Sequence, residues 1–305
     1  MPYAAVLTRY GPPEVLAWSA VAMPEPGPGQ IRIRVHAAGV SPTDPKIRRG
    51  DLRQIFPLPP SAVLGFEAAG TVDALGPAVT GVAIGDEVAV MLPALGGYGE
   101  YALASSWTAK PASVNWADAA ALPASAEAAV GALRQLRVAP GETLLVLGGG
   151  GSVGLIATQL ALSQGVTVIS ATGPRDEELT RELGAIPVRY GPELLSQVST
   201  HAHDAKVDAV LDAAGKGGLG DAVALAGGPA RVLTLADEHA ADFGVVLSAP
   251  TPDRAPDALD QTMPLLAAGK LRLRTQRLLP LRDAAKAHAL LDTGQAHQKL
   301  ILTAG

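Results

Sequence analysis

Hydrophobic and polar residues follow one pattern in the first part of this chain, up to about residue 122. Ile31–His36 alternates apolar and polar residues, as a half-buried strand does. Val63–Asp73 and Glu87–Met91 predict further strands, and Gly85–Asp86 is a turn signal between them. Short strands broken by Gly and Pro predict an irregular antiparallel β unit.

From about Pro123 the pattern changes, because apolar runs of strand length alternate with segments of helical period. The expected strands are Leu144–Leu147, Val166–Ala171, Ile186–Arg189, Ala209–Asp212 and Val232–Leu235. The expected helices are Ala124–Leu136, one after Gly154, Arg175–Leu183 and Glu193–Ser199. This alternation predicts a parallel sheet with helices on both faces. The chain then closes with a helix, a strand, a helix and a strand, expected at Pro256–Leu266, Leu271–Arg274, Arg282–Leu291 and Leu300–Thr303.

Four consecutive glycines follow the strand at Leu144–Leu147. Gly149, Gly151 and Gly154 fit the spacing GxGxxG, in which the glycines permit a tight turn, approach of backbone to a pyrophosphate, and close helix–strand packing. The phosphates would then lie at the helix N-terminus, at Ser152 and Val153. A glycine run can also be an ordinary loop. The strand before it and the helix after it favour a dinucleotide site.

Composition narrows the classes of function. The chain has 305 residues, 48% of them hydrophobic, and a formal net charge of −5, which suits two domains with sizeable cores. No block of like charge predicts a nucleic-acid partner or a membrane surface. The absence of cysteine excludes disulfides, cysteine-bound zinc and a thiol nucleophile. We expect a cytoplasmic protein, because no apolar run is long enough to span a membrane and the first residues lack a signal-peptide pattern.

Motifs along the whole chain carry a family resemblance. In order they are AAGVSPTD (37–44), LGFEAAG (64–70), GGYGEY (96–101), the glycine-rich turn (148–154), GAIPVRY (184–190), VDAVLDAAG (207–215), AAKAHALL (284–291) and KLILT (299–303). With these motifs the chain resembles the medium-chain dehydrogenase/reductase superfamily and, within it, the zinc-free quinone oxidoreductase branch.

The resemblance implies an α/β fold of two domains. Residues 1–122 and 270–305 would form a GroES-like catalytic domain, and residues 123–269 a Rossmann NADP(H)-binding domain with a doubly wound parallel sheet. The active site would lie in the cleft between them. Relatives often form homodimers through the edge of the Rossmann sheet, and the strand near Val245–Leu247 is a plausible edge for that contact.

The chain also departs from the family patterns. Zinc-dependent relatives have GHE with cysteine and histidine ligands, whereas Phe66 follows Gly65 here, so we expect no metal. Ser41 replaces the family asparagine. The junction element GLTAY reads AEAAV at Ala126–Val130, which loses a threonine and adds Glu127. Glu127 is either a buried acid or a residue that points outward from its helix, and we expect the latter.

The end of the second Rossmann strand bears on the choice of cofactor. NAD-binding folds usually place a carboxylate there for the ribose 2′-hydroxyl. Here no carboxylate comes before Asp176, while Thr172 and Arg175 offer a hydroxyl and a guanidinium that suit a 2′-phosphate. We therefore expect NADP(H). Alternatively, Arg175 is a solvated residue at a helix start.

Other cofactor contacts follow from the resemblance. Tyr190 would lie near the adenosine phosphate, although a half-buried packing role is an equal alternative. Leu235 and Ala236, after a late strand, would contact the nicotinamide through their backbone. Lys299, in the closing motif, is also expected among the cofactor-binding residues.

Hydride transfer needs a group that stabilises the developing oxyanion. Ser41 and Lys46 on the first loop are the candidates, with Lys46 as a surface lysine the alternative, and Asp44 is expected to orient the loop. The predicted reaction is metal-free reduction of a quinone or an α,β-unsaturated carbonyl by NADPH. Two alternatives stay open: an NADPH-binding redox sensor or interaction protein with little or no turnover, and an enoyl- or crotonyl-type reductase of a biosynthetic pathway. His36 and His288 are expected to pack, and His201 and His203 to lie in a solvated loop.

Overall fold

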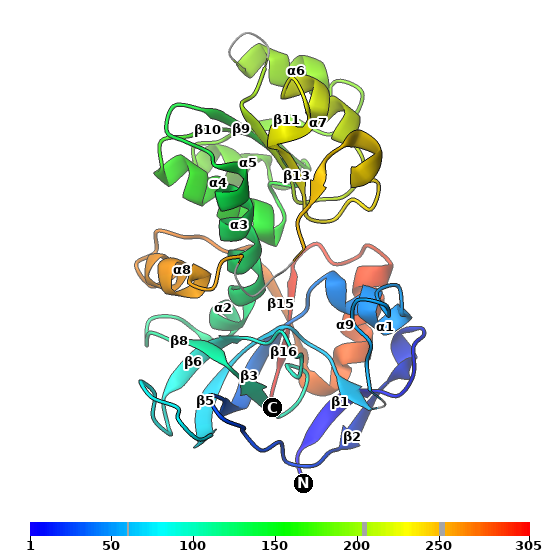
Figure 1. The fold of residues 1–305 in the computed structure, drawn as a ribbon, viewed down its shortest axis with the longest axis vertical. Helices are drawn as coiled ribbons and strands as arrows, with labels where there is room; N and C mark the ends of the chain where they lie inside the picture. The colour runs from blue at the N-terminus through cyan, green and yellow to red at the C-terminus, as the bar shows by residue number, and fades with distance from the viewer. Residues whose placement is uncertain (60, 203–205, 250–253) are drawn as a thin grey trace. The chain divides into compact units, whose positions relative to one another are not determined.

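The computed structural model describes residues 1–59, 61–202, 206–249 and 254–305. The chain forms two compact units (Figure 1). The first unit consists of Met1–Ala124, Leu259–Lys270 and Thr275–Gly305, and the second of Ser125–Ala258 and Leu271–Arg274. Residues 259–269, expected in the Rossmann domain, belong to the first unit. There Thr108 donates a 2.5 Å hydrogen bond to the Asp260 carboxylate.

The second unit is built on a six-stranded sheet in which all neighbouring strands are parallel, in the order β11-β10-β9-β12-β13-β14. The strands are β9 (Thr143–Leu147), β10 (Thr167–Thr172), β11 (Ile186–Arg189), β12 (Ala209–Asp212), β13 (Val232–Thr234) and β14 (Val246–Leu247). The α-helices are α3 (Pro123–Leu136), α4 (Ser152–Ser163), α5 (Glu177–Glu182), α6 (Leu194–His201) and α7 (Leu219–Leu225), with 3-10 turns at Pro229–Arg231 and Ala240–Phe243. This strand order is that of the Rossmann fold.

The first unit contains a seven-stranded mixed sheet in the order β15-β16-β3-β5-β6-β8, with β7 also paired to β3, and a small sheet in the order β2-β1-β4. Its strands are β1 (Tyr3–Leu7), β2 (Leu16–Ala20), β3 (Ile31–Gly39), β4 (Ala62–Val63), β5 (Glu67–Leu75), β6 (Glu87–Met91), β7 (Tyr101–Ala104), β8 (Ser106–Ala109), β15 (Gln276–Pro280) and β16 (Lys299–Thr303). Its helices are α1 (Thr43–Arg49), α2 (Trp116–Ala121), α8 (Ala258–Ala267) and α9 (Ala284–Asp292), with 3-10 turns at Pro13–Val15 and Leu281–Asp283.

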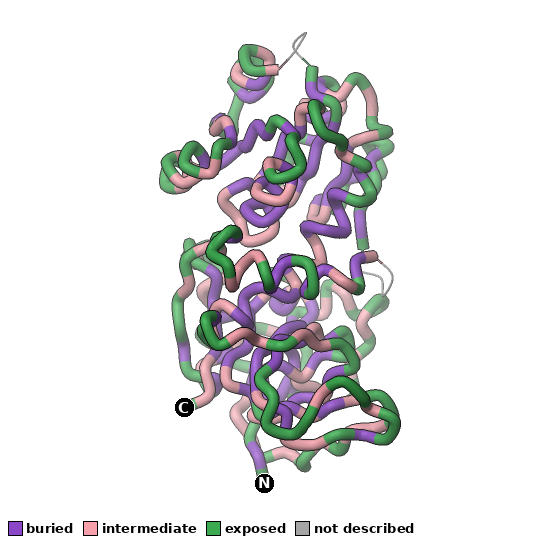
Figure 2. The backbone as a smooth tube through the Cα atoms, turned by 90° about the vertical axis from the view of Figure 1, so that its left-hand side faces the viewer, coloured by how far each residue is buried: buried purple, intermediate pink, exposed green. Residues whose placement is uncertain are grey.

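The cores of the two units follow the hydrophobic pattern. Ile31 and Ile33 on β3 are fully buried. Arg34, which lies between the apolar residues Ile33 and Val35, is exposed, and this confirms the alternation. In the second unit, Leu145 and Val210 are fully buried at the centre of the parallel sheet. Figure 2 shows the buried residues mostly in the interior of each unit and the exposed residues mostly on its outside. Among the helices in the described part of the chain, none combines the length and the apolar character that crossing a membrane requires.

Two strand predictions are wrong. Val63–Asp73 is not one strand, because Gly65 has a φ of +101° and separates β4 from β5. Leu271–Arg274 is not a strand either; the strand begins at Gln276. The side chain of Gln159 bonds both the backbone N–H and the carbonyl of Arg272, at 2.7 and 2.9 Å, so these groups are paired outside a sheet.

Two leucines on adjacent strands provide a matched test of the core of the first unit. Leu302 on β16 is fully buried, whereas Leu278 on β15 is 57% exposed. We expect Leu302→Ala to lower the free energy of unfolding by about 2–5 kcal/mol, because it leaves a cavity. Leu278→Ala should change it by less than about 0.5 kcal/mol. Chemical denaturation measures both, and equal losses would contradict this description of the core.

Candidate active site

The glycine-rich turn joins β9 to α4 by direct backbone contact. A Cβ placed on Gly154 would overlap the carbonyl of Gly148, and a Cβ on Gly149 would overlap the hydroxyl of Ser170. Gly151 is the N-cap of the 12-residue helix α4, with no side-chain cap, so the N–H groups of the first helical turn are available to an anion. Ser152 and Val153, both half-buried, stand in that first turn. The residues therefore fit the phosphates of a dinucleotide.

Hydroxyl groups surround this turn. Ser170 and Thr172 on β10 are buried, and their hydroxyls have no hydrogen-bond partner within the described chain. Tyr190 follows β11; burial raises the pKa of its phenol to about 12, and the nearby backbone of Gly148 acts in the opposite direction. Its hydroxyl therefore lies near the predicted phosphate-binding turn.

A carboxylate also reaches the turn, which the sequence did not reveal. Arg175 is exposed in the turn after β10, as a residue that meets a 2′-phosphate would be. Asp176, one residue later, folds back so that a Cβ on Gly150 would overlap its carboxylate. The positive charge of Arg274 acts on Asp176, and burial lowers the pKa of that guanidinium. Asp176 and Arg274 are therefore additional candidates for cofactor recognition.

The turns after β12 and β13 complete the carboxyl edge of the parallel sheet. Asp212, fully buried, accepts hydrogen bonds from the N–H groups of Ala214 and Gly215, at 2.9 and 3.0 Å. The N–H of Leu235 donates to the Asp212 carbonyl, and that of Ala236 to the hydroxyl of Thr234. A backbone contact from Leu235 or Ala236 to a nicotinamide would therefore come from their carbonyl oxygens.

In the first unit, Ser41 and Asp44 form the start of α1. The Asp44 carboxylate accepts the N–H of Ser41 at 2.7 Å and the N–H of Gly65 at 3.2 Å. Its role in orienting the loop for catalysis stays a prediction. The hydroxyl of Ser41 accepts the N–H of Thr43 at 3.1 Å, which leaves its own hydrogen to be donated. Lys46 is half-buried on α1.

Burial changes the acidity of Asp44. The side chain has 0% exposure, and this desolvation raises its pKa to about 7. The hydrogen bond from Ser41 and the charge of Lys299 act in the opposite direction, while Glu67 adds to the rise. Asp44 therefore changes its charge near neutral pH.

Lys299 lies in an internal ion pair. Its ammonium is 2.5 Å from Oε1 of Glu67, and the two side chains are 7% and 0% exposed. The other Glu67 oxygen accepts the N–H of Ala124 at 2.8 Å. The pair links the first residue of β16 to the first residue of β5, with β3 between the two strands. Its predicted role in cofactor binding remains a prediction.

The other polar residues named from the sequence pack against neighbouring side chains, form an ion pair or lie at the surface. His36 is half-buried and stacks on Trp116, with ring centroids 4.2 Å apart, and His288 is fully buried. Glu127 does not point outward into solvent: it forms an ion pair with Arg254, and both side chains are largely buried. His201 ends α6 and is exposed, while His203 lies outside the described residues.

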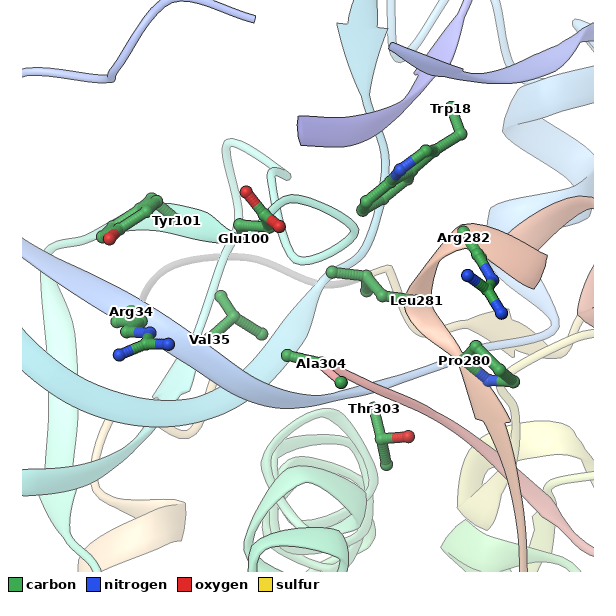
Figure 3. Close-up of a pocket in the computed structure, with 11 residues that line it drawn as sticks. Trp18, Arg34, Val35, Glu100, Tyr101, Pro280, Leu281, Arg282, Thr303 and Ala304 are labelled. Carbon is green, nitrogen blue, oxygen red and sulfur yellow. The ribbon is translucent and has the colours of Figure 1, made fainter. Parts of the chain in front are cut away.

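A pocket of about 340 Å³ occurs elsewhere in the first unit. Arg34 and Tyr101 lie at one side of it, and Trp18 and Arg282 at the other (Figure 3). None of its lining residues belongs to the first loop or the glycine-rich turn. This pocket therefore coincides with neither candidate segment.

Comparisons with known proteins identify the family of the chain. The family model of the alcohol dehydrogenase GroES-like domain matches residues 27–147, and that of the zinc-binding dehydrogenase matches residues 190–302. The chain is 30% identical to a quinone oxidoreductase of Pseudomonas aeruginosa, over 92% of this chain and 93% of the relative. It is 31% identical to a chloroplastic NADPH-dependent alkenal/one oxidoreductase of Arabidopsis thaliana, over 97% of this chain and 78% of the relative.

Among solved structures, a quinone oxidoreductase from Coxiella burnetii superimposes with a TM-score of 0.87 at 28% identity, covering 100% of this chain and 99% of that one. The fold and the glycine-rich turn define a dehydrogenase of the Rossmann type. The chain belongs to the medium-chain dehydrogenase/reductase superfamily, in its quinone oxidoreductase-like branch. Membership of this family implies a nicotinamide cofactor.

The buried pair of Glu67 and Lys299 yields a stability prediction. Lys299→Met leaves a buried carboxylate without its counter-charge, and we expect a loss of about 3–5 kcal/mol in the free energy of unfolding. The double variant Glu67→Gln/Lys299→Met should regain most of it. As a control, Glu182→Ala removes a pair with Arg272 in which both side chains are more than half exposed, and it should cost less than about 1 kcal/mol. A Lys299→Met variant as stable as the wild type in denaturant would contradict the importance of the pair.

Proposed function

We propose that this chain is an NADPH-dependent reductase of quinones or α,β-unsaturated carbonyl compounds that works without a metal. The observation that carries the proposal is the glycine-rich turn at the carboxyl end of β9, with an uncapped helix α4 behind it. The relatives described above, whose names specify a quinone and alkenal or alkenone substrates, support the choice of acceptor.

The end of β10 supports NADPH over NADH. The hydroxyls of Ser170 and Thr172 are buried without a hydrogen-bond partner in the described chain, and that of Ser170 lies against Gly149 of the turn. The exposed guanidinium of Arg175 comes three residues after Thr172. An arginine can bind a phosphate through two parallel hydrogen bonds. Asp176 acts against a 2′-phosphate, but the positive charge of Arg274 offsets its charge. We therefore propose a preference for NADPH that Asp176 moderates.

The reduced nicotinamide supplies a hydride when it is bound. The residues of this chain hold the cofactor and stabilise charge on the acceptor. The Ser41 hydroxyl, oriented by Thr43, donates a hydrogen bond to the acceptor oxygen as negative charge develops there. Lys46, on the same short helix, adds positive charge, and Asp44 keeps the loop in place.

The sequence lacks a complete set of ligands for a catalytic zinc. Phe66 follows Gly65 where zinc-dependent relatives place a histidine, and the chain has no cysteine, so the donor set for a catalytic zinc is incomplete.

We also propose a homodimer formed through the sheet edge at β14, where Val246 is 58% and Leu247 47% exposed. Pairing would cover these apolar side chains and the open edge.

Two neighbouring substitutions test the cofactor preference. Arg175→Ala should weaken NADPH binding about tenfold and leave NADH binding unchanged, because only the phosphate contact is lost. Asp176→Asn should strengthen NADPH binding, because a negative charge near the 2′-phosphate is removed. Calorimetric titration of both variants with both cofactors measures this. Similar dissociation constants of the wild type for NADPH and NADH, or no effect of Arg175→Ala, would contradict the preference.

The acceptor chemistry is tested by NADPH oxidation with a panel of quinones and enones. Ser41→Ala should lower kcat about 10- to 100-fold, because one hydrogen bond to the developing oxyanion is lost. Ser106→Ala, on the exposed strand β8, is the matched control and should leave turnover unchanged. Tight NADPH binding with no turnover across the panel would instead favour a redox sensor or interaction protein.

A further inference from the structure

Three buried polar side chains form a continuous line behind the first loop. The hydroxyl of Tyr98, in the connection between β6 and β7, lies 3.2 Å from Nε2 of His288 on one side, and on the other side it interacts with Asp44. All three residues have 0% exposure. The rings of Tyr98 and His288 meet edge to face, with centroids 5.7 Å apart. The line therefore connects the loop of Ser41 to helix α9.

Arg48 gives this line a direction. His288 and Asp292 are four residues apart on α9 and share one face of the helix. Arg48, fully buried on α1, donates a 2.7 Å hydrogen bond to Asp292, and its charge acts on His288. Nε and Nη1 of Arg48 and Nδ1 of His288 have no hydrogen-bond partner within the described chain. A guanidinium can only donate, so it favours the imidazole that presents a lone pair at Nδ1 and carries its proton on Nε2.

The protonation states agree with that direction. Burial, together with the charge of Arg48, lowers the pKa of His288 to about 3, so the ring is neutral at physiological pH. Burial and the nearby Asp44 carboxylate raise the pKa of Tyr98, which keeps its proton. His288 then donates from Nε2 to the Tyr98 oxygen, and the Tyr98 hydroxyl donates to Asp44.

We propose that His288 and Tyr98 form a one-way hydrogen-bond chain that ends on the carboxylate of Asp44, with its direction set by the charge of Arg48. Tyr98 and His288 are thereby positioning residues for the loop that carries Ser41 and Lys46. Their effect on turnover rests on the proposed reductase function, whereas their effect on Asp44 does not.

The hydrogen-bond chain makes the loop that carries Ser41 and Lys46 sensitive to pH. The ionised Asp44 accepts hydrogen bonds from Ser41, Gly65 and Tyr98 together, whereas the protonated carboxyl must itself donate a proton and fits these three donors less well. Around Asp44, Lys299 from β16 and Tyr98 favour the ionised form, while burial and Glu67 from β5 oppose it. Since Asp44 has a pKa of about 7, we expect the loop to be fixed above neutral pH and loosened below it.

Substitution of Tyr98, which carries the central hydroxyl, tests the hydrogen-bond chain without a measurement of activity. Carbon-13 NMR of the labelled aspartate carboxyl groups, followed across pH, reports the titration of Asp44, and its loss in Asp44→Asn assigns the signal. Tyr98→Phe should raise the Asp44 midpoint by about one pH unit, because a hydrogen bond to the charged form is lost. Tyr101→Phe removes a hydroxyl on the neighbouring strand β7 and should leave the midpoint unchanged. An unchanged midpoint in Tyr98→Phe overturns the proposal.

A pair of substitutions at His288 tests the direction. His288→Gln keeps an N–H donor near the position of Nε2 and should preserve the wild-type midpoint, whereas His288→Leu should raise it as Tyr98→Phe does. Nitrogen-15 NMR of the wild type should show the tautomer protonated at Nε2. The tautomer protonated at Nδ1 overturns the one-way chain even if no variant folds.

Turnover gives the last readout. In the wild type, kcat should fall as the pH is lowered through the Asp44 midpoint, and in Tyr98→Phe this fall should move to higher pH by the shift seen in NMR. A shifted Asp44 midpoint together with no turnover of any acceptor would refute the proposed function but not the proposed hydrogen-bond chain. Turnover whose pH dependence is the same in Tyr98→Phe and the wild type would refute the positioning role.

Discussion

The contact between the backbones of Gly148 and Gly154 is the constraint on which the nucleotide-binding unit depends. A single Cβ at Gly154 would overlap the Gly148 carbonyl, so α4 can leave β9 at this angle only with glycine there. The same turn leaves the first N–H groups of α4 uncapped and brings them to the carboxyl edge of the sheet. Phosphate recognition therefore follows from the way in which strand and helix pack, and the hydroxyls and charges around the turn select among dinucleotides.

In the first unit, buried charged side chains provide the corresponding constraint. Asp44 and Glu67 have no exposure to solvent, and each is stabilised by neighbours: Asp44 by two backbone N–H groups and Tyr98, Glu67 by Lys299 and the N–H of Ala124. Buried carboxylates of this kind fix the segments that bond them, because an unpaired charge would be costly. The loop of Ser41 is thus held from beneath by groups that do not themselves reach a substrate.

Local patterns predicted most of the elements and the nucleotide-binding turn. The strands Glu87–Met91, Ile186–Arg189 and Ala209–Asp212 have the predicted bounds, since their apolar runs end at clear turn signals. Contacts between distant residues could not be predicted in this way. Glu127 finds Arg254 far along the chain, and the Gln159 side chain pairs the backbone of Arg272 in place of a strand. The approach of Asp176 to Gly150 and the line from His288 to Asp44 also depend on tertiary packing, for which one sequence carries no periodic signal.

The central claim is that the chain transfers a hydride from a nicotinamide to an activated acceptor. Reduction of a simple cyclic enone with NADPH deuterated at C4, in its 4R and 4S forms, followed by mass spectrometry and NMR of the product, tests it most directly. The account predicts one deuterium on the β-carbon of the saturated ketone from one of the two forms and none from the other. Oxidation of NADPH with no deuterium in the product from either form, or no oxidation at all, would contradict it.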